Sequence, residues 1–144
     1  MLDATALAEG TTTDTTNGAI LYSAVSPIGG SQIALLVPFQ VHVKHSAVSA
    51  IVTVTLELYN GPTISDTPAF TVWGTKEQLS PTANEWRLIS QTAVVLFSPP
   101  SWSPGQRLFQ VRATPVTAGT LTYGSDGALA NDSISIFQLG AIDQ

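Results

Sequence analysis

The residues of this chain that could do chemistry are few, and their spacing does not bring them together. His42 and His45 are the only two imidazoles. A strand sends positions i and i+3 to opposite faces, so this spacing disfavours a shared metal ion unless the chain bends between them. No serine stands in the Gly-x-Ser-x-Gly turn that presents a nucleophile. Cysteine is absent, which excludes disulfides and thiolate catalysis. We therefore predict that the protein is not an enzyme.

Oxygen ligands for a metal ion are concentrated in the loop that ends at Asp132. Asp126, Asn131 and Asp132 could bind calcium, which takes about six to eight oxygen ligands. Their spacing does not match a helix–loop–helix calcium loop, and the same residue types are ordinary in turns. We expect a turn here, with no metal ion and no cofactor.

Charge is scarce along the whole chain. Ten acidic and five basic residues make 10% of 144, against about 25% in an average soluble domain. No charge occurs between Asp14 and Lys44 or between Arg87 and Arg107. Because charges keep exposed surface soluble and unassociated, we expect partners to cover much of this surface. The five cations are scattered and the net charge is −5, so we predict no nucleic-acid partner.

Neither a membrane span nor a secretory leader is expected. The longest apolar run covers residues 33–39, which is far too short to cross a bilayer and is broken by Pro38. The first residues lack the basic and apolar regions of a signal peptide. We therefore predict no membrane partner and assembly in the cytoplasm of the host cell.

Period-two alternation dominates the chain from Ala19 onward and predicts β-strands. Two strands, at 32–44 and 50–59, alternate most clearly. We expect ten of their side chains to face one core: Ile33, Leu35, Val37, Phe39, Val41, Val43, Val52, Val54, Leu56 and Leu58. Pro38 cannot donate to a ladder, which predicts an edge position or a bulge there.

Six further strands are expected, separated by connections rich in Pro, Gly, Ser and Asn. They cover 19–25, 69–75, 85–97, 107–114, 117–123 and 132–141. In the last of them the apolar residues change face, which predicts a bulge near Ile136. About eight short strands and no helical period predict an all-β fold, an antiparallel β-sandwich or barrel in a single domain.

The first 17 residues differ from the rest, which suggests an N-terminal extended arm (1–17) before one β-sandwich domain (18–144). Ordering an arm costs about 1–2 kcal/mol per residue in backbone entropy, so we expect a neighbouring molecule to order it by strand addition. Trp73 and Trp86 fit core or interface packing, whereas a tryptophan in a Pro-rich loop can contact a partner or fold back onto its own domain. The predicted partner-binding residues are Thr11, Thr12, Thr13, Thr15, Thr16 and Trp102.

The order of these features resembles a small jelly roll, of the kind shared by TNF-like trimers and viral coat, head-decoration and tail-fibre domains. The resemblance depends on four features: the polar arm at 3–18, the long strand at 32–44, the Pro/Gly/Ser loops, and a last strand at 133–141 that lies close to residue 144, the last of the sequence. It covers about residues 18–142 and brings no functional residue with it. It implies a jelly-roll-like antiparallel sandwich and a structural subunit, often trimeric.

Together these observations predict a virion structural protein of a bacteriophage, a capsid decoration or cement subunit. It would contact capsid or other virion proteins and form a homo-oligomer, with a trimer favoured over a dimer. The alternative is a receptor- or carbohydrate-binding module of a phage tail or fibre, using Trp102 and neighbouring loops. High copy number on a shell would support the first interpretation, and glycan affinity would support the second.

Overall fold

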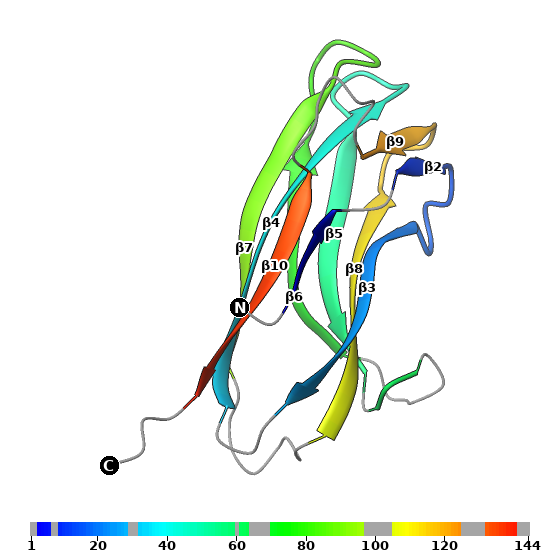
Figure 1. Cartoon of the computed structure of the whole chain (residues 1–144). Helices are drawn as coiled ribbons and strands as arrows, with labels where there is room; N and C mark the ends of the chain where they lie inside the picture. The colour runs from blue at the N-terminus through cyan, green and yellow to red at the C-terminus, as the bar shows by residue number, and fades with distance from the viewer. Residues whose placement is uncertain are drawn as a thin grey trace.

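A computed structural model shows two antiparallel sheets packed face to face (Figure 1). The residues that it describes are 3–6, 9–28, 32–59, 61–63, 70–96, 105–124 and 132–140. These residues form ten strands and no helix. Within the same ranges, therefore, no helix is available to cross a membrane. The predicted all-β antiparallel sandwich is confirmed.

The larger sheet has six strands with the long strand β4 at its centre. β7 pairs with one side of β4, while β10 and β9 share the other side along its length. β1 then continues the sheet from β10, and β2 continues it from β9. The six strands are β1 (Asp3–Ala6), β2 (Gly10–Thr12), β4 (Gln32–His45), β7 (Arg87–Leu96), β9 (Leu121–Tyr123) and β10 (Ser133–Gly140).

The smaller sheet has four strands in the order β3–β8–β5–β6. They are β3 (Ala19–Ile28), β5 (Ile51–Leu58), β6 (Phe70–Gln78) and β8 (Gly105–Pro115). All of its neighbouring pairs are antiparallel. It lies against the larger sheet over most of the length of β4 (Figure 1).

The chain crosses between the two sheets in the order of a jelly roll. β1 and β2 take the first position in the larger sheet, and β9 and β10 take the last. Between them the chain passes through β3, β4, the pair β5 and β6, β7 and β8, changing sheet at each step. Counted by position, this gives eight strands in two four-position sheets, the architecture of jelly rolls. The eight strands expected from the alternation correspond to β3–β10, and β1 and β2 are two further strands in the segment expected to be an arm.

The segment expected to be an extended arm contributes strands to the protein's own sheet. β1 pairs with β10 from Asp3↔Ile136 to Ala6↔Ser133. β2 pairs with β9 over three residues. We expected a neighbouring molecule to supply the edge, whereas these strands find their edges within the same chain. The domain boundary at residue 17 stays a prediction.

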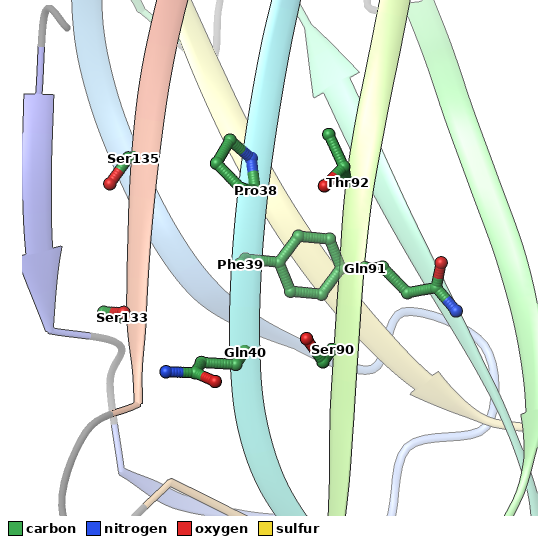
Figure 2. A pocket seen from close by; sticks show the side chains of 8 residues that line it. All are labelled: Pro38, Phe39, Gln40, Ser90, Gln91, Thr92, Ser133 and Ser135. Atoms are coloured by element: carbon green, nitrogen blue, oxygen red, sulfur yellow. The ribbon is translucent and has the colours of Figure 1, made fainter.

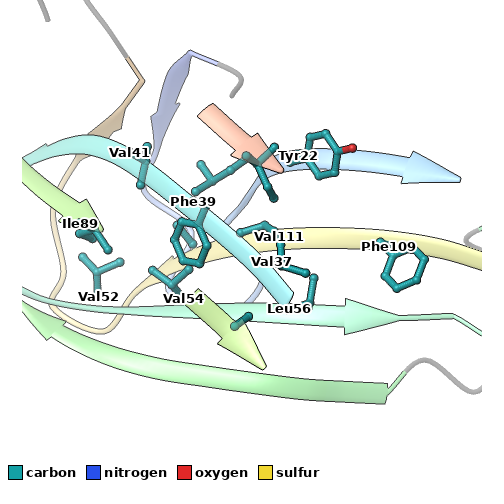
Figure 3. Close-up of a cluster of buried hydrophobic side chains, with 14 of the residues drawn as sticks. Tyr22, Val37, Phe39, Val41, Val52, Val54, Leu56, Ile89, Phe109 and Val111 are labelled. Carbon is teal, nitrogen blue, oxygen red and sulfur yellow. The ribbon is translucent and has the colours of Figure 1, made fainter. Parts of the chain in front are cut away.

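The core between the sheets includes the residues that the alternation selected, together with side chains of β3, β7, β8, β9 and β10 (Figure 3). Nine of the ten expected core residues are buried, and the side chain of Ile33 lies outside the described part. Phe39 and Trp73 join the two sheets, with ring centroids 5.8 Å apart and planes at 84°. This edge-to-face geometry is favourable for aromatic pairs. Phe109 and Val111 of β8 pack into the same cluster.

Pro38 lies inside a strand that is paired on both sides, which corrects the expectation of an edge or a bulge. On the β7 side the ladder continues through the pair Pro38↔Thr92. On the β10 side the ladder passes over Pro38 and Val37, which lie opposite Ser135 and Ile136. Because proline has no N–H to donate, the ladder between β4 and β10 has a gap at this point. The strand β4 itself continues through Pro38.

Two other local predictions differ from the structure. The expected bulge near Ile136 is absent, because Ile134 and Ile136 face the core and Phe137 simply faces outward. The register of β10 shifts only between Leu139 and Gly140. The strand expected at 117–123 begins at Leu121, since residues 116–119 form a bend.

Candidate interaction surface

The outward side of the larger sheet is made by the residues that alternate with the core residues of β4, β7 and β10. We call the stretch of this side that carries no charge the uncharged outer face. Its members are Leu36, Pro38, Gln40, Leu88, Ser90, Thr92, Val94, Leu96, Ser133, Ser135 and Phe137. No aspartate, glutamate, lysine, arginine or histidine occurs among them.

A shallow hollow of about 210 Å³ lies in the middle of the uncharged outer face. The register aligns Ser90, Gln40 and Ser133 in one row across three strands (Figure 2). The next row contains Thr92, Pro38 and Ser135, where the ladder has its gap. Small hydroxyl side chains on flat strands leave this part open, and it can exchange hydrogen bonds without any formal charge.

One end of the uncharged outer face is apolar. Leu36 lies between Val94 of β7 and Phe137 of β10. Val94 is 47% exposed, and Leu96 beyond it is 75% exposed. Clustered exposed apolar side chains are typical of surfaces that contact other proteins.

The opposite end is closed by a buried carboxylate. Asp132 has a side chain only 4% exposed, and its Oδ1 lies 2.6 Å from Nδ1 of His42. The backbone N–H of His42 donates to Oδ2 of Asp132 at 3.0 Å. Two hydrogen bonds to one carboxylate fix the start of β10 against β4. The sequence marked Asp132 as a turn residue and did not reveal this pair.

Beyond that pair lies a second hollow of about 440 Å³, mostly apolar in its lining. The ammonium group of Lys44 lies 4.7 Å from the ring centroid of Trp86, within the range of a cation–π contact. Thr11, Thr122 and Tyr123 line the same hollow. Trp86, expected in core or interface packing, is half-buried and lines a surface hollow.

The predicted partner-binding threonines lie together on the surface around the end of β2. Thr11 lines the second hollow, and the hydroxyl of Thr12 accepts the N–H of Asp14 at 3.1 Å. Thr13, Thr15 and Thr16 are exposed in and beside the following turn. Contact with a partner stays a prediction for all five.

The turn after β2 is held by the Asp14 carboxylate. Its Oδ1 accepts the N–H groups of Asn17 and Thr16, each at 2.8 Å. These hydrogen bonds favour the charged carboxylate and hold the pKa of Asp14 below its ordinary value. Trp102, the sixth predicted contact residue, lies outside the described residues.

His45 has a structural role away from the outer face. It is 2% exposed, with Nδ1 accepting the N–H of Ala47 at 2.9 Å and Nε2 lying 3.1 Å from the carbonyl oxygen of Thr117. Gly119, at φ 130°, lies so close that an added Cβ would meet Cε1 of His45 at 2.8 Å. His42 and His45 thus bind different partners on opposite faces of β4, as the spacing predicted. Within the described ranges, no group of three or more His, Cys, Asp or Glu residues could hold a metal ion.

The geometry is therefore that of a contact surface. An uncharged, hydroxyl-rich face lies between an apolar end and an end that carries His42, Lys44 and Trp86. The available signal in the sequence was the charge-free stretch 88–106 combined with period two, which together place a run of uncharged side chains on one face. What the sequence did not reveal is that the outward residues of β4 and β10 continue this face.

Comparison with known proteins identifies the class of fold. No family model matches the sequence, and no curated protein sequence matches it. A structure of infectious bursal disease virus, Gx strain, is similar with a TM-score of 0.56 and 14% identity over 94% of this chain and 32% of that chain. The VP2 subviral particle of the same virus is similar with a TM-score of 0.56 and 12% identity over 97% of this chain and 33% of that chain.

The fold is thus a jelly-roll-like β-sandwich similar to part of a viral capsid protein. The chain spans about one third of the length of the viral chains that it matches. At these identities the similarity shows the fold alone. A CBM4 structure has a TM-score of 0.39 with 15% identity over 90% of this chain and 81% of that chain, and at that level it carries no argument.

Proposed function

We propose that this protein is a structural subunit of a virus particle, a bacteriophage capsid decoration or cement protein that stabilises the shell by protein–protein contacts. It acts in the virion after assembly in the host cytoplasm, as a homo-oligomer in which a trimer is favoured. Its contacts are with capsid or other virion proteins, and it needs no enzyme activity or cofactor. The fold that it shares with a viral capsid protein supports this proposal.

The observation that carries the proposal is the uncharged outer face. A surface that stays in water is normally covered with mixed charges, and this one combines hydroxyl groups with exposed Val94 and Leu96. Burying it against a shell removes apolar area from water, which contributes about 25 cal/mol per Å². The hydroxyl groups can still exchange hydrogen bonds with the partner. No charge is left unpaired in the contact, which avoids the desolvation cost of a buried ion.

A capsid co-sedimentation experiment tests this function. Ser133→Lys introduces a long cation at an exposed position in the middle of the uncharged outer face, and Ser23→Lys does the same at an exposed position on the outward side of the smaller sheet. We expect Ser133→Lys to weaken binding to the particle at least tenfold and Ser23→Lys to leave it within twofold. Equal binding by both variants, or failure of the wild-type chain to sediment with any capsid of its phage, would overturn the proposal.

A receptor- or carbohydrate-binding module of a tail or fibre is the second candidate. The observation that favours it is the hollow beside Trp86, where aromatic rings and the hydroxyl groups of Thr11 and Thr122 meet. An aromatic face packs against the apolar side of a sugar ring while hydroxyl groups bind its edge. Glycan-array binding that is lost in Trp86→Ala would support this function, and an array without signal would exclude the sugars tested.

A further inference from the structure

We propose that the free edge of β7 is an interface between two copies of this chain, which pair antiparallel through β7 about a two-fold axis. This inference concerns self-association and does not depend on the viral function. β7 pairs with β4 on one side only. Within the part of the chain that the structure describes, no strand covers its other side. The backbone groups along that side are available to a second strand.

The other sheet edges carry the features by which proteins discourage strand addition, and β7 does not. β1 has four residues and β2 has three, so both are too short to offer a long template. β3 contains Pro27 and a register shift, and β6 contains Lys76, Glu77 and a register shift. Proline, charge, shifts and short length all protect edges.

β7 runs for ten residues without a proline, a glycine or a register shift. Its one charged residue is Arg87, at its first position. On its outward face Leu88, Val94 and Leu96 are 48%, 47% and 75% exposed. A long, regular, apolar edge of this kind is expected to be covered in the functional state.

The sequence of β7 makes a second copy the best occupant, because the strand is complementary to itself in one register. With Gln91 on the two-fold axis, Leu88 lies opposite Val94 of the second copy. Ser90 then lies opposite Thr92 of the second copy, so apolar residues meet apolar residues and hydroxyl groups meet hydroxyl groups. On the inward side Ile89 lies opposite an alanine of the second copy. In the same register Arg87 lies opposite Val95 of the second copy, and Gln91 on the axis donates to Oε1 of Glu77 in its own chain at 2.7 Å. Cross-strand pairs of apolar residues and of hydroxyl residues stabilise a sheet.

The pairing also joins two larger sheets edge to edge into one continuous sheet. The two uncharged outer faces then lie side by side on the same side of that sheet, doubling the area that a partner can cover. A two-fold contact of this kind is isologous.

A charge-exchange experiment tests both the interface and its register. Leu88→Glu alone and Val94→Lys alone each place a charge opposite an apolar side chain, and we expect each to shift the sedimentation-equilibrium mass from a dimer, or a multiple of it, toward half that mass. The double variant Leu88→Glu/Val94→Lys places a carboxylate opposite an ammonium group twice about the axis. We expect the double variant to dimerise at least tenfold more tightly than either single variant.

The matched control is Val25→Lys, which changes a residue with the same 48% exposure on the outward side of the smaller sheet. It should leave the mass unchanged. A wild-type monomer, a mass unaffected by both single variants, or a double variant that associates less than either single variant would overturn the β7 pairing. An oligomer with an odd number of copies that persists in Val94→Lys would be compatible with the proposed trimer and would contradict the β7 pairing.

Crosslinking gives a second measurement that does not depend on destabilising the interface. Because the chain has no cysteine, a single Gln91→Cys places one thiol on the proposed axis. Opposite residues of antiparallel strands have Cα atoms about 4.5–5.5 Å apart, which a disulfide can span. Mild oxidation should give a covalent dimer of Gln91→Cys and not of Val25→Cys. Equal crosslinking of the two variants, or none in either, would contradict the pairing.

Discussion

The two outward sides of the sandwich are built by the same alternation and differ in charge. On the smaller sheet, Arg112 of β8 contacts Glu57 of β5 through Nε and Oε1, and Lys76 of β6 is exposed on the same side, opposite Thr53. On the larger sheet, eleven outward residues form the uncharged outer face. Both sheets cover the same apolar core, so the core does not require this difference.

This difference in charge distinguishes a side with the usual properties of a solvent-exposed surface from a side with the properties of a contact surface. The Arg112–Glu57 pair and Lys76 give the outward side of the smaller sheet the mixed charges that are normal for a surface in water. In β4, β7 and β10 of the larger sheet the charged and titratable groups lie at one end, at His42, Lys44, His45, Arg87 and beside Asp132, and the rest of these three strands is uncharged. The larger sheet also contains β7, the long edge without protection. The uncharged outer face and the free edge of β7 are the two features on which we propose the larger sheet as the binding side of the molecule.

The largest expected effect comes from removing β1 and β2, the two N-terminal strands, both of which belong to the larger sheet. Deleting residues 1–12 removes β1 and β2 and uncovers the edges of β10 and β9. We expect a loss of stability greater than that of any single substitution below, with faster amide exchange in β10 than in β3. A truncated chain with an unchanged thermal midpoint would instead favour the interpretation of this segment as an arm for a neighbouring molecule.

The second prediction concerns the core that both sides share. Phe39→Ala removes a ring that is 4% exposed and packed against Trp73. A buried phenylalanine replaced by alanine costs about 3–5 kcal/mol. Denaturant unfolding measures this loss. A value under about 1 kcal/mol would show that the ring contributes little to joining the sheets.

The third prediction compares one polar contact from each side. Asp132→Ala leaves the N–H of His42 without its carboxylate acceptor in a partly buried position, and an unsatisfied donor that stays out of reach of water costs about 1–3 kcal/mol. Glu57→Ala breaks a pair in which Arg112 is 25% exposed and still donates to the carbonyl of Asn17. Partly exposed pairs of this kind contribute up to about 1 kcal/mol. A larger loss of unfolding free energy in Glu57→Ala than in Asp132→Ala would contradict the interpretation that the Asp132–His42 contact stabilises the fold more than the Arg112–Glu57 pair.

The smallest expected effect is the titration of Asp14, in the turn that follows β2. Backbone N–H groups of Asn17 and Thr16 stabilise its carboxylate, so its pKa in the folded protein lies below the ordinary 3.8. The contribution of the turn to stability is therefore fully present above that ordinary value. It is lost as the pH falls below 3.8 and through the lowered pKa. A carboxyl titration by NMR with a midpoint at or above 3.8 would contradict these hydrogen bonds.

Period-two alternation in the sequence determined much of the fold. It identified the core residues of β4 and β5, because a strand with one buried face must alternate. It also gave the all-β class and predicted a strand for each of β3 to β10. It failed at Pro38, at Ile136 and at the start of β9, because pairing partners decide local register and strand length, and partners are not visible in the sequence.

The candidate surface was predictable only in part. The stretch between Arg87 and Arg107 without charge predicted an associating surface, and part of it lies on the uncharged outer face. Thr11 lies at the surface, and its contact with a partner stays a prediction. The Asp132–His42 pair joins residues 90 positions apart, and no local pattern reveals such a contact.

By itself, therefore, the sequence determined which side chains face inward and how little charge the outward sides carry. Both follow from residue type and the geometry of a single strand. Only the tertiary structure decided that three separate segments form one uncharged face, that the N-terminal segment completes the sheet, and that β7 has a free edge. These depend on which strands become neighbours, and in a jelly roll the neighbours come from distant parts of the chain.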